Sequence, residues 1–186
     1  MGRFMNHKKW VVALALIATA LILTHLPVSE ADAAASASDF QIEGSTLTKY
    51  RGSDERVTIP DTVEVVGESA FENNQKVQFV VVPKSVKRMD AYVFWGCDNL
   101  EEVVLGKGLT SVDEYAFSGC TGLKQITIPE NVQSIDAQAF AGCTNLTDIY
   151  IPDTVTSIAD DAFLNCDNVT IHADEGSVAA KFAQKL

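Results

Sequence analysis

Hydrophobic residues recur along this chain at one fixed spacing, a period of twenty-three positions. Phenylalanine takes one position of the period five times in succession, at Phe71, Phe94, Phe117, Phe140 and Phe163. Proline marks a second position, at Pro60, Pro83, Pro129 and Pro152, with Gly106 in the remaining copy. Self-similarity at a fixed spacing of this length indicates a solenoid of five tandem units, in which each unit forms one coil and packs on its neighbours.

Within one unit, residues 123–145, the hydrophobic spacing changes partway along. Ile126 and Ile128 alternate with polar residues ahead of Pro129, which predicts a short strand with one buried face that ends at the proline. The apolar residues of the second half are spaced by three and four: Val132, Ile135 and Ala139. That spacing predicts a helical or 3₁₀ turn packed against the same interior.

Three runs of this unit carry a resemblance to a known family: Ile-Pro-Glu-Asn-Val (128–132), Ser-Ile (134–135) and Ala-Phe-Ala-Gly-Cys (139–143). They resemble the BspA-like leucine-rich repeat family of bacterial surface and secreted proteins. The resemblance extends from about Phe40 to the C-terminus and implies an α/β repeat solenoid, a leucine-rich repeat stack of short parallel strands along one face. It also implies a role in adhesion or recognition, and no enzymatic activity.

The two ends depart from the repeat, and we expect each to cover one end of the stack. Residues 34–56 predict an N-terminal cap hairpin, with strands near 40–42 and 47–50 and glycines at 44 and 52. The repeat solenoid occupies residues 57–168. Residues 169–186 predict a C-terminal cap, with a truncated strand at 169–171 and a short helix capped by Ser177. The face of that helix predicted to shield the last coil consists of Val178, Phe182 and Leu186.

Residues 1–33 have the form of a secretory signal peptide. A basic stretch is followed by an apolar run over residues 10–26, and then by small residues at 31–35. Cleavage after Ala33 is the expected site, with Ala35 and Ala37 as alternatives. An uncleaved anchor is the other interpretation, because an apolar run of this length is near the short limit for a membrane span. We expect a secreted or extracellular protein, able to associate with the cell surface, and no membrane insertion after cleavage.

The chain is acidic, and this narrows the choice of partner. Its net charge is −11, and it becomes −12 without residues 1–33, because that segment holds three basic and two acidic side chains. A surface of this sign repels phosphate backbones and anionic headgroups, which argues against nucleic acid as a partner. The same charge is typical of a solvated, soluble surface.

The cysteines also follow the period: Cys97, Cys120, Cys143 and Cys166. Stacked coils place equivalent residues about 4.8 Å apart, which lies within the Cα range of roughly 4.4 to 6.8 Å for a disulfide. Against disulfides, the first unit has Asn74 at this position, and cysteine is often buried as a free thiol. We expect four buried reduced thiols, with disulfides and a metal site as the open alternatives.

Catalytic or cofactor-binding constellations are not visible in the sequence. His172 is the one histidine beyond the predicted signal peptide; it ends the last strand, and no nucleophile–base pair accompanies it. The paired carboxylates at 101–102 and 160–161, and Asp153, fall on outward positions and favour a solvated face. We therefore expect no enzyme, no cofactor and no metal site.

What remains is the surface of a rigid stack. The outward positions of the predicted strands bring together a candidate ligand-binding set: Phe79, Val81, Val104 and Tyr150. A second face carries a candidate aromatic patch: Tyr92, Trp95 and Tyr115. Exposed apolar and aromatic residues of this kind favour recognition of protein or glycan, although strand propensity and partial burial also account for them. A structural or self-assembling cell-surface unit without a discrete ligand is the alternative function.

Overall fold

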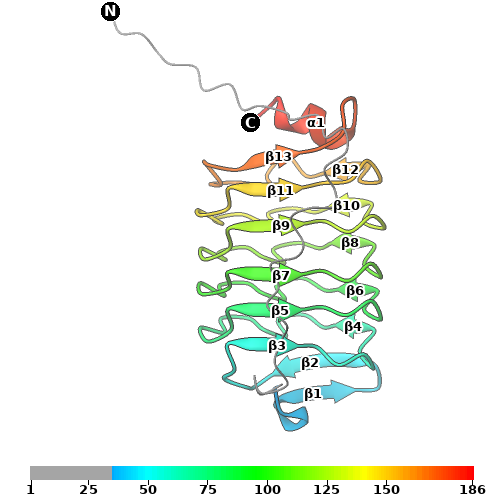
Figure 1. Ribbon diagram of the computed structural model, residues 1–186, viewed down its shortest axis with the longest axis vertical. Coiled ribbons are helices and arrows are strands. Elements are labelled where there is room, and N and C mark those ends of the chain that lie inside the picture. Colours follow the sequence, from blue (N-terminus) through cyan, green and yellow to red (C-terminus); the bar gives the residue numbers. More distant parts are fainter. Residues whose placement is uncertain (1–34) are drawn as a thin grey trace, which may run out of the picture.

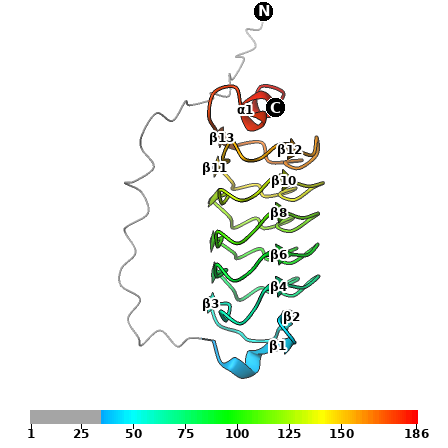
Figure 2. The same cartoon turned by 90° about the vertical axis from the view of Figure 1, so that its right-hand side faces the viewer.

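The chain forms one stack of short parallel strands, closed by a hairpin at one end and a helix at the other (Figures 1 and 2). The structure is a computed structural model that describes residues 35–186. The predicted signal peptide lies outside the described residues. Within residues 35–186, no helix has the length and apolar character needed to cross a membrane.

Two columns of strands run along the stack. The first column consists of β3 (Arg56–Thr58), β5 (Phe79–Val81), β7 (Glu102–Val104), β9 (Gln125–Thr127), β11 (Asp148–Tyr150) and β13 (Thr170–His172). The second consists of β4 (Val65–Val66), β6 (Arg88–Met89), β8 (Ser111–Val112), β10 (Ser134–Ile135) and β12 (Ser157–Ile158). Every paired strand within a column is parallel. The predicted leucine-rich repeat solenoid is therefore confirmed.

The first column forms the outward face that we call the strand face. The middle residue of each strand points into the core, as the alternating pattern predicts: Val57, Val80, Val103, Ile126, Ile149 and Ile171 are all buried. The two columns are divided on opposite sides of one coil, the first between β7 and β9 and the second between β6 and β8. That coil contains β7 and β8 and carries Gly106 where other coils carry proline.

The second half of each unit is not the helical or 3₁₀ turn that its spacing predicts. Val132 and Ala139 are buried as expected, but β10 lies between them and is followed by linked tight turns. These turns contain left-handed backbone, with φ of 52° at Gln138 and 73° at Gly142. A helix needs right-handed φ at every residue, so the left-handed residues of these turns, two in each of the first four coils and Asn165 alone in the last, exclude it.

The turns form a hydrogen-bonded ladder of their own. The backbone N–H of Phe117 donates to the carbonyl of Ala139 in the next coil at 2.8 Å, and that of Gly119 donates to Ala141 at 2.8 Å. Alternate N–H groups close the turn itself, as from Cys120 to Phe117 at 3.1 Å. The backbone polar groups that a helix would pair internally are thus paired between coils.

A spine of aromatic rings runs through the core from one cap to the other. Neighbouring ring centroids lie 5.0 to 5.8 Å apart along Phe40, Tyr50, Phe71, Phe94, Phe117, Phe140, Phe163 and Phe182. In the middle of the spine, Phe117 and Phe140 are almost parallel, with 4° between the ring planes. The repeating phenylalanine is therefore the residue through which each coil packs on the next.

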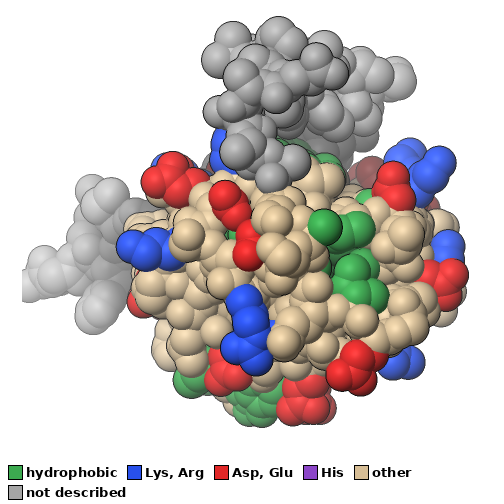
Figure 3. Space-filling view, turned by 90° about the horizontal axis from the view of Figure 1, so that it is seen from below, with side chains coloured by type: hydrophobic (Ala, Val, Ile, Leu, Met, Phe, Trp, Pro, Cys, Tyr) green, Lys and Arg blue, Asp and Glu red, His purple; other side chains and the backbone are tan. Residues whose placement is uncertain are grey.

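The predicted N-terminal hairpin is present. Strands β1 (Phe40–Glu43) and β2 (Thr46–Tyr50) pair antiparallel after a short 3₁₀ helix, η1 (Ala37–Asp39). β2 also pairs in parallel with β4, so the hairpin continues the second column. Seen from this end (Figure 3), the coloured surface shows a few hydrophobic side chains among polar and backbone atoms, with charged side chains both on the face and around its rim. The hairpin thus covers the open end of the core.

The predicted C-terminal cap is present, but its buried face differs from the expected one. Helix α1 (Val178–Ala183) begins after Ser177, whose hydroxyl accepts a hydrogen bond from the backbone N–H of Ala180 at 3.1 Å. Phe182 is buried as predicted, together with alanines of the helix. Val178 is only half-buried, and Leu186 is 44% exposed because the helix ends before it.

The cysteine column satisfies carbonyl groups of the turns. The four cysteines are buried free thiols, and each donates from Sγ to a phenylalanine carbonyl of the preceding coil. The distances are 3.1 Å from Cys97 to Phe71 and 2.9 Å from Cys166 to Phe140. In the first unit Asn74 takes this position and donates to Gly52 of the hairpin at 3.5 Å. Every residue of this column therefore donates a hydrogen bond to a backbone carbonyl, and cysteine does so with a less polar side chain than asparagine.

We expect these thiols to be unreactive until the protein unfolds. Thiolate is the reactive form, and burial raises the pKa of Cys97 to about 12 and also raises the pKa of Cys120. A hydrogen bond with Cys143 lowers the pKa of Cys166, but burial of its side chain keeps the reagent away. Titration of the native protein with a chromogenic disulfide reagent at pH 8 should give almost no signal. Unfolding in denaturant without reductant should then release four thiols; a smaller number would show that disulfides form in the column.

Candidate functional site

The strand face brings three of the four predicted ligand-binding residues into one patch. Phe79 and Val81 both point outward from β5, and Val81 pairs directly with Val104 of β7. Val104 is 38% exposed, and the other two side chains are half-buried. We call Phe79, Val81 and Val104 the apolar patch. Its members lie together because parallel register places equivalent residues of adjacent coils side by side.

Charged side chains border the apolar patch. The guanidinium of Arg56, on β3, lies 4.2 Å from the centroid of the Phe79 ring. On the other side, Lys124 Nζ forms an ion pair with Glu101 Oε2 at 2.7 Å. Both groups of this pair are largely exposed, so it stabilises the fold little. The patch is thus an apolar centre with a charged rim, the arrangement typical of protein interfaces.

Tyr150 lies apart from the apolar patch, in a second cluster at the C-terminal end of the strand face. Its ring stacks on that of His172 with centroids 4.4 Å apart, and His172 Nε2 lies 2.7 Å from Asp148 Oδ1. The hydrogen bond from His172 lowers the pKa of the Asp148 carboxyl. The sequence did not predict this carboxylate partner for the histidine. β13 pairs with β11 one position short of the full period, so His172 falls directly beside Tyr150.

The three aromatic residues predicted on the second face lie on the turns. Tyr92 and Tyr115 stack with centroids 4.8 Å apart and 6° between their planes, and Trp95 is 38% exposed. Both tyrosines have left-handed backbone, with φ of 60° and 55°. Because the tyrosine rings face each other, their shared faces are closed to a sugar. Trp95 is the aromatic residue of this face that is open to a ligand.

The described part of the chain offers little that is arranged for catalysis or metal binding. Residues 35–186 contain no group of three or more histidine, cysteine, aspartate or glutamate side chains able to hold a metal ion. The carboxylates expected to be outward are exposed at Glu101, Asp153 and Asp160, and half-buried at Glu102 and Asp161. They line the outside of the coils and form no enclosed site.

The repeat length, the parallel strands and the buried phenylalanine spine define a leucine-rich repeat solenoid. Residues 45–170 match the family described as BspA type leucine rich repeat region, in six copies, and the chain belongs to this family. The match begins within the hairpin, and its six copies are one more than the five predicted units. No curated protein matches the chain.

Three solved bacterial structures are similar to this chain. A leucine-rich cell surface protein from Faecalibacterium prausnitzii is 33% identical with a TM-score of 0.69; the match covers 74% of this chain and 37% of that protein. The leucine-rich repeat protein of T. pallidum is 28% identical, with a TM-score of 0.69 and coverage of 72% and 68%. One from Bacteroides ovatus is 29% identical, with a TM-score of 0.61 and coverage of 70% and 36%.

The chain spans only part of the length of these relatives, about a third of the Faecalibacterium and Bacteroides proteins. The comparisons therefore assign the repeat architecture and a family of bacterial surface proteins.

Proposed function

We propose that this protein is a secreted, non-catalytic recognition module that binds a protein partner through the apolar patch of the strand face, in adhesion or host and cell-surface interaction. The single observation that carries the proposal is the exposure of Val104 beside Val81 and Phe79 on a regular sheet surface. The repeating apolar residues are buried in the core, whereas these three side chains are at positions that do not repeat. Non-repeating apolar residues at the surface are not needed for folding.

The character of the patch favours protein over glycan. Glycan recognition uses exposed ring faces, whereas the Phe79 ring is covered on one side by the Arg56 guanidinium. The two valines offer no polar group to a sugar hydroxyl. An apolar centre bordered by charges suits the apolar side chains of a protein surface, with the charges setting its orientation.

The family supports the setting of this function. The Faecalibacterium relative is described as a cell surface protein, and the predicted signal peptide would place this chain outside the cytoplasm. Tyr150 and the Trp95 face are secondary candidates, since they lie on other parts of the surface.

The test is binding of the protein without residues 1–33 to an array of host-matrix proteins and cell-wall glycans. We expect binding to a protein, and we expect the double variant Phe79→Ala, Val104→Ser to weaken it at least about tenfold, because the centre of an interface carries most of its affinity. The matched control is Leu164→Ala, which removes an exposed apolar side chain that belongs to none of the candidate sets and should leave binding unchanged.

Light scattering on the same samples separates recognition from self-assembly. A monomer whose binding depends on the apolar patch supports the proposal. A stable oligomer that dissociates in the double variant would assign the patch to self-assembly instead, and unchanged binding by the double variant would rule out the strand face as the binding surface.

A further inference from the structure

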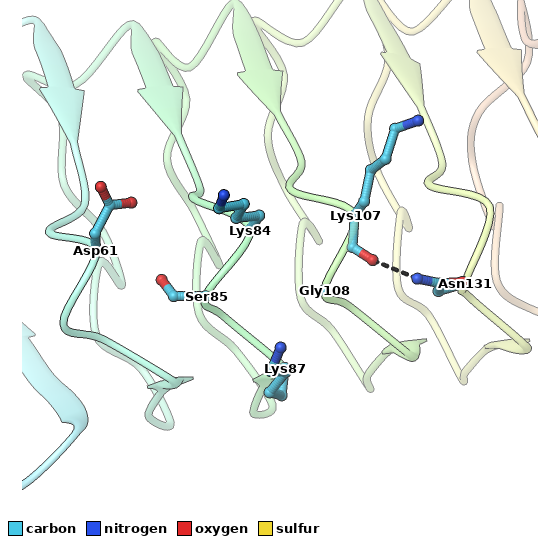
Figure 4. Close-up of a pocket in the computed structure, with 7 residues that line it drawn as sticks. All are labelled: Asp61, Lys84, Ser85, Lys87, Lys107, Gly108 and Asn131. Carbon is cyan, nitrogen blue, oxygen red and sulfur yellow. Dashed lines mark hydrogen bonds between the residues drawn. The ribbon is translucent and has the colours of Figure 1, made fainter.

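A groove opens where the chain leaves the strand face, at the carboxyl ends of β5 and β7 (Figure 4). It has a volume of 510 Å³ and extends over four successive coils, from Asp61 in the first to Asn131 in the fourth. Three lysines line it: Lys84, Lys87 and Lys107. We call it the lysine groove.

One residue that lines the groove has no side chain. The residues that follow the strand ends by four positions are Thr62, Ser85, Gly108 and Asn131, and only Gly108 has no side chain beyond Cα. Its backbone lies against the preceding coil so closely that a Cβ would overlap the carbonyl oxygens of Lys84 and Val86. On the far side, Asn131 Nδ2 donates to the carbonyl of Lys107 at 2.6 Å, which fixes that wall.

The groove is positive on an acidic protein. The chain carries a net charge of −11, yet three ammonium groups and a single carboxylate, that of Asp61, line this depression. Within residues 35–186 neither Lys84 nor Lys87 forms an ion pair. Lys107 has only a long contact of 3.9 Å to Glu130, between two largely exposed groups. The positive charges of the three lysines therefore have little compensation from neighbouring carboxylates.

A buried donor lies in the same groove. Ser85 Oγ is shielded from solvent and makes no hydrogen bond to any of the described residues. A buried hydroxyl without a partner is costly, and an ion or another bound group is one way to supply the partner. Two kinds of donor, ammonium and hydroxyl, thus line one depression. Donors of this kind together with excess positive charge favour an oxyanion.

We propose that the lysine groove binds a tetrahedral oxyanion, a sulfate or phosphate ester carried by a partner molecule. A lysine ammonium acts as a point charge that suits the oxygens of such a group without the planar geometry that an arginine–carboxylate pair requires. A dianion balances the excess of two positive charges in the groove. The site is independent of the apolar patch, although Lys84 and Lys107 each follow a patch valine by three positions.

The direct test is titration of the protein lacking residues 1–33 with inorganic phosphate and with sulfate, followed by amide chemical shifts in two-dimensional NMR spectra. We expect saturable shifts confined to residues 84–87 and 107–108. The double variant Lys84→Gln, Lys107→Gln should weaken binding about tenfold or more, because hydrogen bonds to charged groups are the stronger ones. Binding should also weaken with added chloride.

The matched control is Lys76→Gln, which removes an exposed lysine outside the groove and should leave the shifts unchanged. Shifts spread over the whole surface, equal losses in the control and the groove variant, or no saturable shift with either anion would overturn the proposal. Unaltered spectra of the variants away from the groove establish that they are folded.

Two polymers then distinguish the source of the oxyanion. Dextran sulfate presents sulfate esters and polyphosphate presents phosphate groups, each at many positions along one chain. Stronger groove-dependent binding of one polymer identifies which group the partner carries. If neither polymer competes with inorganic phosphate for the groove, the site does not accept a polymer-borne oxyanion and the proposal is wrong in that respect.

Discussion

Phe117→Ala should lower the free energy of unfolding by about 3 to 5 kcal/mol, the largest effect of any single truncation that we predict. Phe117 has no exposed surface, and its ring lies 5.3 Å from both Phe94 and Phe140. Removing the ring therefore breaks two ring contacts and leaves a cavity at the centre of the spine. Backbone ladders on both sides of the coil prevent the neighbouring coils from closing it.

The measurement is the denaturant midpoint by circular dichroism, with Trp95→Ala as the control. The Trp95 side chain is of comparable size but 38% exposed, so its loss should cost less than about 1.5 kcal/mol. Equal costs for the two variants would show that the spine does not hold the coils together.

Hydrogen exchange should locate the damage. Because coils of a solenoid contact only their neighbours, exchange in Phe117→Ala should accelerate most in the coils that contain Phe94, Phe117 and Phe140. Uniform acceleration over the whole chain would instead indicate that the stack unfolds as one unit.

The repeat made most of the core predictable. Each recurring apolar residue sits at an equivalent point of every coil, so a single period identifies the buried set, including Phe117 and Cys120. The caps were predictable for a related reason. Tyr50 and Phe182 interrupt the period but keep aromatic character, and the structure places both at the ends of the spine.

The conformation of the turns was not predictable from the spacing of apolar residues. A helix and a series of tight turns both place apolar residues at spacings of three and four. The residue type distinguishes the two only where a glycine takes the left-handed position, as at Gly119. At Tyr92 and Tyr115 a residue that rarely adopts φ above zero does so. At these two tyrosines the left-handed backbone is held by hydrogen bonds to the next coil. This is an effect of tertiary structure, which local sequence does not encode.

The surface sites depend on departures from the repeat. The contact of His172 with Asp148 arises because the last coil is one position shorter than the others, which shifts the register of β13 on β11. The charge of the lysine groove arises because Lys84 and Lys107 take a position at which the three other coils have acidic residues. Aligning the coils strictly on the 23-residue period hides both features, because the alignment retains only what the coils share.

Gly106→Pro should destabilise the protein, although it restores the residue that four other coils have at this position. Substitution toward a repeat consensus and replacement of glycine by proline in a compatible turn usually stabilise. Here a Cβ on Gly106 would lie 2.5 Å from the carbonyl carbon of Pro83 and 2.7 Å from the carbonyl oxygen of Val82. These are backbone atoms, so they move only if the coil moves. We expect a loss of about 2 to 3 kcal/mol, typical of overpacking.

Two controls separate the possible causes. Gly106→Ala adds the Cβ without the ring and should also destabilise, because the overlap involves Cβ itself. Pro129→Gly, at the equivalent position of a coil where proline fits, should cost only about 0.5 to 1 kcal/mol through the entropy of the unfolded chain. A higher denaturant midpoint for Gly106→Pro than for the wild type would contradict the close approach of this coil to the preceding one.

The same variant connects this coil to the lysine groove. Gly106 and Gly108 lie against the same stretch of the preceding coil, residues 82–86, in the coil where both strand columns divide. Proline at 106 should push this coil away from its neighbour and increase the distance between Lys84 and Lys107, which belong to the two coils. We therefore expect Gly106→Pro to weaken phosphate binding as well as stability, whereas Pro129→Gly should leave phosphate binding intact. Wild-type phosphate affinity in folded Gly106→Pro would show that the groove does not depend on this close approach.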